Sequence, residues 1–231
     1  SLIASAVYVV NDIRDVEKDK KHAKKKHRPI ASGVVPVPVA VGVMAALIIG
    51  AVLIGIAGEL PVWAWALAAL YFAINVAYSF GLKNIPIVDI AILSAGFVIR
   101  VLFGGMVLDI SVSSWLYLTI LAGSLYLGLG KRRNELQLNG SKSRAVNKYY
   151  SINFLDKNMY VCMALLLVFY SLWATSPINE GGYLFLTIPI VILLFMTYSL
   201  QIEKDTSLGD PVDVLTGNKA LMGLLAFYLV T

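Results

Sequence analysis

Residues 36–57 read PVPVAVGVMAALIIGAVLIGIA, an uncharged run rich in Ala, Val, Ile and Leu. About 20 helical residues cross a hydrocarbon layer roughly 30 Å thick, so this run is long enough to span a membrane. The run does not alternate polar with apolar residues, which favours a helix over a strand of a transmembrane β-barrel. Comparable runs recur near residues 1–20, 60–80, 86–108, 113–138, 150–176, 181–203 and 212–231. The sequence therefore predicts an all-α, polytopic transmembrane helix bundle.

The composition agrees with a chain that faces lipid along most of its surface. Only 14% of the residues are charged and the mean hydropathy is +0.77, values outside the range of a separate water-soluble domain. We therefore expect residues 1–231 to form a single integral membrane domain. The lone Cys162 lies in an apolar run, so the sequence predicts neither a disulfide framework nor a thiol-based metal site.

The loops between the expected spans fall into two sets according to their charge. One set lacks Lys and Arg and comprises residues 58–60, 109–112 and 176–182. The opposite set carries the basic residues and comprises 20–35, 81–85, 131–149 and 203–217. Because cytoplasmic loops are enriched in Lys and Arg, the basic set is predicted to be cytoplasmic. Topology alone accounts for the net charge of +5, so binding to nucleic acid is not indicated.

A polar stretch follows the first span directly and reads Asn11-Asp12-Ile13-Arg14-Asp15-Val16-Glu17-Lys18-Asp19. On a helix, Asn11, Asp15 and Asp19 drift by only about 80° and form one ridge of oxygen ligands. Mg²⁺ prefers hard oxygens and keeps positions open for substrate phosphate, so the ridge indicates a metal-held diphosphate. These three residues are therefore the catalytic and metal-binding candidates. The alternative is a solvated helix end whose acids pair with the lysines that follow.

The same stretch resembles the first signature of the UbiA superfamily of intramembrane prenyltransferases. The matching residues are Asn11-Asp12-x-x-Asp15-x-x-x-Asp19, followed by Arg28-Pro29-Ile30-Ala31-Ser32-Gly33. The resemblance implies a ring of about nine transmembrane helices around a central cavity, of which this chain holds eight if one helix precedes Ser1. It also implies that the acidic motif holds Mg²⁺ and a diphosphate.

Where members of that superfamily carry a second acidic motif, this chain has Gly130-Lys131-Arg132-Arg133-Asn134-Glu135-Leu136. Cations cannot ligate magnesium, but they bind phosphate directly, Arg through a fork of donors and Lys as a point charge. A donor with a diphosphate at one end and a phosphate at the other would satisfy both motifs, and phosphoribosyl pyrophosphate is such a molecule. The alternative for the basic motif is simple anchoring on the cytoplasmic side.

The basic motif narrows the resemblance to one branch, the decaprenyl-phosphate phosphoribosyltransferases. Further matching stretches are 78–83, 99–105 and 209–213. This branch implies Mg²⁺-dependent transfer of 5-phosphoribosyl from phosphoribosyl pyrophosphate to a polyprenyl phosphate, with release of pyrophosphate. It also implies a role in cell wall (arabinogalactan) biosynthesis, a plasma-membrane location and an active site on the cytoplasmic side. The oligomeric state is open, and a homo-oligomer is one option.

Two ionisable residues fall within one expected span, Asp89 near its cytoplasmic end and Arg100 deeper. Charged groups in a membrane are costly and usually face the protein interior, so each is a functional candidate. Arg100 meets either an acid on a neighbouring helix or the phosphate of a lipid acceptor, and we weigh these two roles equally. The full set of substrate-binding candidates is Arg14, Lys24, Arg28, Lys83, Arg100, Lys131, Arg132, Glu135 and Tyr149.

Two other functions compete with this hypothesis. A conventional UbiA-type enzyme would move a prenyl chain from its diphosphate to an aromatic acceptor, but its acidic second motif is missing here. A membrane transporter would use Asp89 and Arg100 to line a substrate path. The chain shows no paired broken helices in two related halves, so the transporter ranks last.

Overall fold

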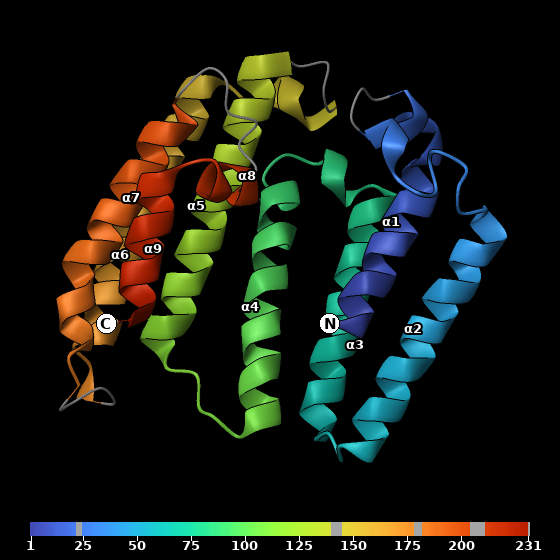
Figure 1. Ribbon diagram of the computed structural model, residues 1–231, viewed down its shortest axis with the longest axis horizontal. Coiled ribbons are helices and arrows are strands. Elements are labelled where there is room, and N and C mark those ends of the chain that lie inside the picture. Colours follow the sequence, from blue (N-terminus) through green and yellow to red (C-terminus); the bar gives the residue numbers. More distant parts are fainter. Residues whose placement is uncertain (22–24, 140–144, 178–181, 204–210, 231) are drawn as a thin grey trace. The chain divides into compact units, whose positions relative to one another are not determined.

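A computed structural model describes residues 1–21, 25–139, 145–177, 182–203 and 211–230, and every regular element in these ranges is helical (Figure 1). The α-helices are α1 (Leu2–Lys20), α2 (Val37–Ala57), α3 (Val62–Phe80), α4 (Val88–Leu108), α5 (Ser114–Asn139), α6 (Ile152–Ala174), α7 (Ile188–Ile202), α8 (Pro211–Thr216) and α9 (Lys219–Val230). Short 3-10 turns are η1 (Lys25–His27), η2 (Leu82–Asn84), η4 (Ala145–Tyr149) and η6 (Leu184–Thr187). The predicted all-α fold class is confirmed.

The helices follow the apolar runs of the sequence, with one exception at the C-terminal end. Among the described residues, five segments are long and apolar enough to cross a membrane, namely α2, α3, α4, α6 and the combined η6–α7 segment Leu184–Ile202. The run expected at 212–231 is instead divided into α8 and α9 at Gly217 and Asn218. The side chain of Asn218 caps α9 by accepting from the Ala220 amide at 2.9 Å. An Asn that caps a helix competes with helix continuation, which explains the break.

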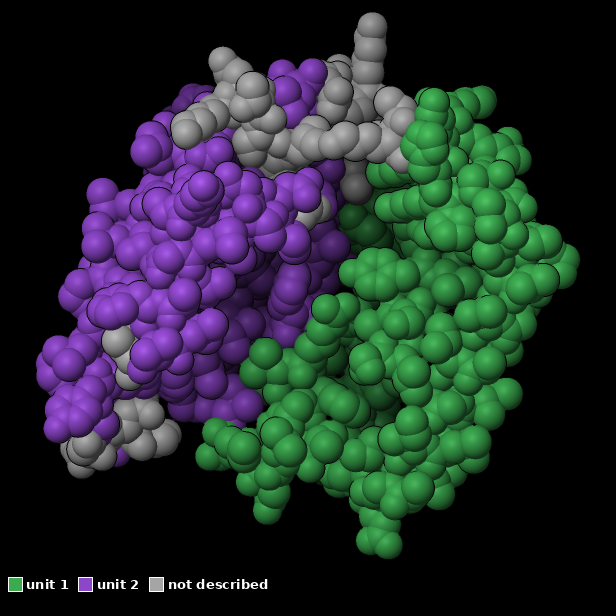
Figure 2. Space-filling view, in the orientation of Figure 1, with its two compact units in different colours: residues 1–83, 99–111 green, residues 84–98, 112–231 purple. Residues whose placement is uncertain are grey.

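The chain forms two compact units that divide α4 between them (Figure 2). Unit 1 comprises residues 1–83 and 99–111, and unit 2 comprises residues 84–98 and 112–231. The expected organisation of residues 1–231 as one membrane domain stays a prediction.

In unit 1, α1 packs against both α2 and α3. A buried cluster of Val7, Tyr71 and Ile99 joins α1, α3 and the C-terminal half of α4. At the α2–α3 turn, a Cβ added at Gly55 would lie 2.5 Å from a ring carbon of Trp65, so only glycine allows this approach. This packing fixes α1 beside α3, and the polar residues of both helices lie at the same end.

In unit 2, α5 and α6 form the most extensive helix pair, and α7 packs against α6 and α9. Tyr126, Leu155 and Ile202 belong to its main core cluster, which also includes Ile90 from the N-terminal half of α4. A Cβ added at Gly123 would lie 2.9 Å from Leu166, so a small residue lets α5 approach α6. The close packing holds the last turns of α5, with their basic residues, beside the start of α4.

Candidate active site

The polar candidates at the C-terminal end of α1 and the segments beside it come together in unit 1. Asp12, Asp15 and Asp19 follow one another at three- and four-residue spacing, so they share one face of the helix. We call Asn11, Asp12, Asp15 and Asp19 the acidic cluster. Three carboxylates this close repel one another unless cations lie among them. Two cations from other segments supply that charge.

Arg28 lies between the first and last carboxylates of the acidic cluster. Its Nη1 donates to Asp12 Oδ1 at 2.7 Å and to Asp19 Oδ2 at 2.9 Å. The Arg28 side chain keeps 38% of its surface exposed, whereas Asp19 keeps 6%. Arg28 is therefore held by two acids and still faces solvent on one side, an arrangement that allows it to meet a further anion.

The turn after Arg28 holds this residue in place. The Ser32 amide donates to the Arg28 carbonyl at 2.8 Å, and the Val35 amide donates to the Pro29 carbonyl at 2.9 Å. Gly33 adopts φ of 82°, a left-handed conformation that favours glycine. The stretch that resembles the UbiA signature thus forms a closed turn whose first residue is Arg28.

Lys83 is the second cation of the acidic cluster. Its Nζ lies 2.8 Å from Asp15 Oδ1 and 2.6 Å from Asp15 Oδ2, although the two residues are 68 positions apart in the chain. One turn earlier, Ser79 Oγ donates to Asn11 Oδ1 at 3.3 Å. The end of α3 and the η2 turn therefore contact members of the acidic cluster that Arg28 does not contact, and the predicted residues Asn11, Asp15, Asp19, Arg28 and Lys83 lie together in one cluster.

Of the two other predicted residues of this region, the structure describes only Arg14. The guanidinium of Arg14 stacks over the Phe80 ring, with its carbon 5.3 Å from the ring centre. Lys24 lies outside the described residues. Their predicted roles in binding substrate stay predictions.

The oxygen set of the acidic cluster has the chemistry that Mg²⁺ prefers. Within the described ranges, no group of three or more His, Cys, Asp or Glu side chains is arranged as a ready metal site. Mg²⁺ commonly binds through only one or two carboxylates, with water and substrate phosphates completing its six ligands. An amide oxygen from Asn11 and a carboxylate from Asp15 or Asp19 fit that habit, so the metal role stays an open prediction.

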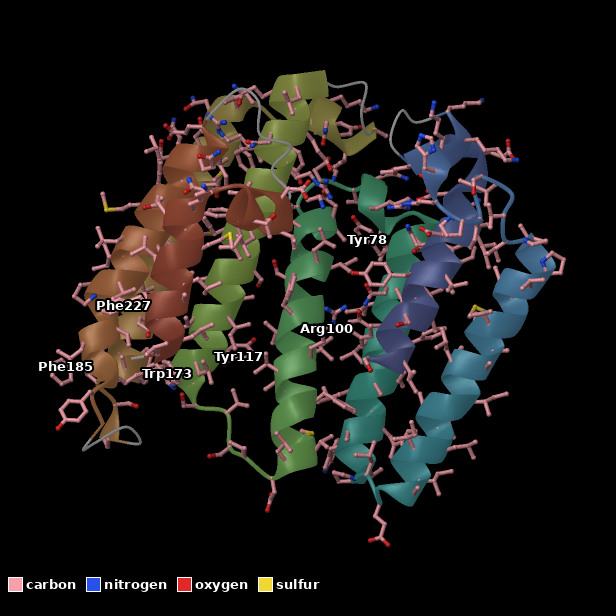
Figure 3. The ribbon with its side chains drawn as sticks, viewed as in Figure 1. Tyr78, Arg100, Tyr117, Trp173, Phe185 and Phe227 are labelled. Atoms are coloured by element: carbon pink, nitrogen blue, oxygen red, sulfur yellow. The ribbon has the colours of Figure 1, made fainter. Side chains whose placement is uncertain are left out.

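Arg100 also lies in unit 1, and its contacts are aromatic. It donates to the Tyr71 hydroxyl and stacks over the Tyr71 ring, with its guanidinium carbon 5.1 Å from the ring centre. The Tyr8 hydroxyl is a further hydrogen-bond partner. Figure 3 shows Arg100 extending from α4 toward α1 and α3. Neither tyrosine was singled out from the sequence.

The basic motif of unit 2 contains a fully buried ion pair. Arg132 on α5 is 1% exposed and Asp89 on α4 is 0% exposed. Arg132 Nε donates to Asp89 Oδ2 at 2.6 Å, and Arg132 Nη1 donates to Glu135 Oε2 at 2.7 Å. We call Asp89, Arg132, Glu135 and Tyr150 the buried network. Because both main partners are shut off from solvent, this position favours an ordering role for Arg132 over direct contact with phosphate.

Tyr150 completes the buried network and was missed as a site residue. Its hydroxyl donates to Asp89 Oδ1 at 2.7 Å and accepts from the Ile87 amide at 2.6 Å. Burial and the Asp89 carboxylate raise the pKa of Tyr150 to about 12, so the phenol keeps its proton. Ile87 has φ of 69°, which is strained for a β-branched residue. Such strain is concentrated at functional sites, but only the structure reveals it.

The remaining candidates of the basic motif are more accessible. Lys131 is half-buried on α5, and Tyr149 is 62% exposed, with the Lys148 ammonium 4.9 Å from its ring centre. Arg133 pairs with Asp156 of α6 at 2.6 Å. Lys131 and Tyr149 are therefore better placed than Arg132 to meet a ligand.

One missed residue of the acidic cluster did have a sequence signal. Asp12 shares Arg28 with Asp19, and the two acids are seven residues apart, which is the spacing of two helical turns. The ridge of Asn11, Asp15 and Asp19 was chosen by four-residue spacing, which left Asp12 out. Ser79 carried no comparable signal, because its role depends on how α3 packs beside α1.

Comparison with known proteins identifies the family of this chain. Residues 1–214 match the UbiA prenyltransferase family. A decaprenyl-phosphate phosphoribosyltransferase of Mycolicibacterium smegmatis is 33% identical, over 100% of this chain and 76% of its own length. Similarly named proteins of Mycobacterium tuberculosis and Corynebacterium glutamicum are 34% and 33% identical, over 100% and 96% of this chain and 77% and 68% of their own lengths. With its apolar spanning helices, this chain is a multi-pass membrane transferase of the UbiA prenyltransferase family.

Proposed function

We propose that this protein transfers 5-phosphoribosyl from phosphoribosyl pyrophosphate to a polyprenyl phosphate and releases pyrophosphate. The names of the relatives support this activity, since they are decaprenyl-phosphate phosphoribosyltransferases that the chain covers over most of their length. The observation that carries the proposal is the acidic cluster, where acids and two cations from separate segments meet at one end of unit 1. Acids for a metal and cations for phosphate are what a diphosphate donor requires.

Asn11, Asp15 and Asp19 are the residues that would hold Mg²⁺. The bound metal would neutralise part of the charge on the diphosphate and so make pyrophosphate a better leaving group. Arg28 and Lys83 already lie against these carboxylates at 2.6–2.9 Å. A diphosphate bound to the same acids would therefore come within reach of both cations, which stabilise its charge as the bond to the sugar breaks.

The reaction needs little proton transfer. A lipid phosphate is already an anion at neutral pH, so one of its oxygens can attack C1 of the ribose without a strong general base. The new bond joins that oxygen to C1, and the bond from C1 to the diphosphate oxygen breaks. Attack opposite the leaving group inverts C1. Positioning and charge stabilisation then supply most of the rate.

The basic motif supports a phosphoribosyl donor over a prenyl diphosphate. Lys131 and Tyr149 are accessible enough to bind a phosphate group, while the buried network of Arg132 orders the end of α5 beside α4. Transfer of a prenyl chain to an aromatic acceptor is the second candidate, favoured by the family match alone. The second acidic motif that such enzymes use is replaced here by Lys131, Arg132 and Arg133.

The proposal includes an orientation in the plasma membrane. In the alternation of spans and loops along the sequence, the acidic cluster and the Lys-rich and Arg-rich segments are predicted on the same side, and positive segments favour the cytoplasmic side. Phosphoribosyl pyrophosphate, a water-soluble donor, would then enter from the cytoplasm. The isoprenoid acceptor would enter from the lipid, and its product belongs to the supply of cell wall arabinose.

The test incubates the purified full-length protein with labelled phosphoribosyl pyrophosphate, polyprenyl phosphate and Mg²⁺. The expected result is a labelled, lipid-soluble product that is lost when a chelator removes the metal. The matched variants are Asp15→Ala and Glu17→Ala, since Glu17 lies on the same helix but pairs with the exposed Lys20. Glu17→Ala should keep activity. Label in lipid only when a prenyl diphosphate and an aromatic acceptor are supplied would favour the second candidate and overturn the proposal.

A further inference from the structure

Arg100 is an exposed cation deep within a membrane-spanning helix. It follows the first residue of α4 by twelve positions, so it lies about 18 Å along a helix of roughly 30 Å. Its side chain is exposed. A cation that faces lipid tails at this depth costs about 2.5–3.5 kcal/mol, so an exposed Arg100 requires water or an anion.

The surroundings of Arg100 are built for an anion. Arg100 donates to the Tyr71 hydroxyl and stacks on its ring, and Tyr8 is a further partner. A phenol that accepts from Arg100 can donate its own proton to a third group. Tyr71 is 7% exposed and anchors the guanidinium, whereas Tyr8 is 65% exposed. The three side chains come from α4, α3 and α1, so packing in unit 1 fixes their positions.

A line of polar residues connects Arg100 with the acidic cluster. On α1, Tyr8 lies four residues before Asp12 and seven before Asp15, so these residues share a face. On α3, Asn75 Nδ2 donates to the Tyr71 carbonyl at 2.8 Å, and Ser79 Oγ donates to the Asn75 carbonyl at 3.1 Å. Seven residues of helix correspond to about 10 Å, so Arg100 lies beyond the acidic cluster on the membrane side.

The proposed reaction needs a second anion site on the membrane side of the acidic cluster. The leaving diphosphate and the attacking phosphate lie on opposite sides of one sugar carbon, and the reacting atoms approach to about 3–3.5 Å. If the acidic cluster holds the diphosphate, the attacking phosphate must be one sugar carbon away. An isoprenoid acceptor has its tail in the membrane, so its phosphate arrives from the side on which Arg100 lies.

We infer that Arg100, Tyr71 and Tyr8 bind the phosphate of the polyprenyl phosphate acceptor. The inference rests on the proposed function for the identity of the acceptor, and on the exposed cation between two phenols for the site itself. Arg100 supplies a fork of donors, and Tyr8 and Tyr71 hold that fork and add hydroxyl donors. The site would recognise the lipid phosphate before any donor is bound.

The test measures equilibrium binding of labelled polyprenyl phosphate to the full-length protein in nanodiscs, without donor and without turnover. Arg100→Gln should weaken this binding at least tenfold, and Tyr71→Phe should weaken it severalfold. Tyr117→Phe is the matched control, because Tyr117 is a tyrosine of α5 in unit 2, whereas Arg100, Tyr71 and Tyr8 all belong to unit 1 (Figure 3). Arg100→Lys keeps the charge but loses the fork, so its affinity should fall between those of the wild type and Arg100→Gln.

Competition with unlabelled compounds distinguishes a site for polyprenyl phosphate from a site for other phosphates. Unlabelled polyprenyl phosphate should displace the label, whereas polyprenol, phosphatidylglycerol and inorganic phosphate should not. Equal displacement by phosphatidylglycerol would identify a general site for anionic lipid and overturn the inference, and displacement by inorganic phosphate would do the same. Unchanged binding by Arg100→Gln, or by Arg100→Lys and Tyr71→Phe together if the Gln variant does not fold, also overturns it.

Kinetics distinguish failure of this inference from failure of the proposed function. In active protein, Arg100→Gln should raise KM for polyprenyl phosphate at least tenfold and change KM for phosphoribosyl pyrophosphate less than twofold. If the wild type makes no phosphoribosyl lipid but binds polyprenyl phosphate through Arg100, the proposed function fails and this site stands. If the wild type is active and its KM for the lipid is unaffected by Arg100→Gln, the site fails and the function stands.

Discussion

Arg28 and Arg132 each hold two carboxylates, yet their surroundings differ. Arg28 bridges Asp12 and Asp19 with 38% of its side chain exposed, whereas Arg132 bridges Asp89 and Glu135 with 1% exposed. An exposed pair can exchange partners with a substrate at little cost, but a buried charge that loses its partner is strongly unfavourable. In the acidic cluster, the Arg–carboxylate ion pairs can therefore be replaced by contacts with a substrate. In the buried network, the same kind of ion pair holds the helices in place.

Among the variants that test this difference, Asp15→Ala is expected to have the largest effect, which is on turnover. Asp15→Ala removes a proposed metal ligand and should lower kcat/KM by about 100-fold or more, as loss of one transition-state group commonly does. The variant should also lose some stability in detergent, because the Lys83 side chain is only 12% exposed and loses its partner. Activity of Asp15→Ala within twofold of the wild type would contradict the metal role. Glu17→Ala provides the baseline for an acid on the same helix.

A matched pair of arginine variants measures the difference in stability directly. Arg132→Met leaves Asp89 buried without its cation and should cost about 3–5 kcal/mol of unfolding free energy. Arg28→Met breaks contacts that solvent partly replaces and should cost about 1–2 kcal/mol. The measurement is reversible unfolding in mixed micelles. Equal losses for the two variants would remove the distinction between the clusters.

The double variant Asp89→Leu with Arg132→Met sharpens the same point. Replacing a buried ion pair by apolar residues of similar volume is often neutral, so the double variant should regain most of the stability that Arg132→Met loses. If it regains stability but not activity, the buried network orders residues that the reaction uses. If it stays as unstable as Arg132→Met, packing and not charge explains the loss.

The sequence predicted the helical fold well because lipid imposes a simple rule. Every backbone polar group within a membrane must be satisfied internally, so long apolar runs become helices. The break between α8 and α9 was missed, since the Asn218 cap is a local hydrogen-bond choice inside an apolar run. A mean hydropathy taken over a long window does not detect such a local helix break.

The candidate site was predictable where its residues share a helix and not where they meet across helices. Asp15 and Asp19 follow from spacing on α1, but the partner of each is 68 or 9 positions away in the chain. Arg132 was predicted to bind phosphate because the sequence of a basic motif does not reveal whether its side chains are buried or exposed. Which face of α5 meets α4 is decided by packing, with Gly128 close to Ile90, and single-sequence patterns do not contain that register.

A smaller effect is expected for the phenol of the buried network. Tyr150→Phe removes both the donor to Asp89 and the acceptor for the Ile87 amide, and it should cost about 1–3 kcal/mol of unfolding free energy. Tyr149→Phe is the control, because the Tyr149 side chain is 62% exposed. This variant should change the unfolding free energy by less than about 0.5 kcal/mol. A Tyr150→Phe variant as stable as the control would show that water replaces the phenol.

The smallest effect is expected at Ile87, where two terms oppose each other. A left-handed β-branched residue costs roughly 1–2 kcal/mol, which glycine would relieve. Glycine also gives the unfolded chain more freedom, which costs about 0.5–1 kcal/mol. Since the Ile87 side chain is 64% exposed, little packing is lost, and Ile87→Gly should change the unfolding free energy by less than about 1 kcal/mol.

Ile87→Pro tests the hydrogen bond at the same position. Proline lacks the amide that donates to Tyr150 and cannot adopt a positive φ, so it should destabilise the protein far more than glycine does. The double variant Ile87→Gly with Tyr150→Phe then measures the energetic coupling between the backbone strain at Ile87 and the hydrogen bond to Tyr150. Glycine keeps the amide donor, whereas Phe removes its acceptor. If the two changes are additive to within about 0.5 kcal/mol, the strain at Ile87 is independent of the buried network. A larger coupling would show that Tyr150 holds the start of α4 in its strained conformation.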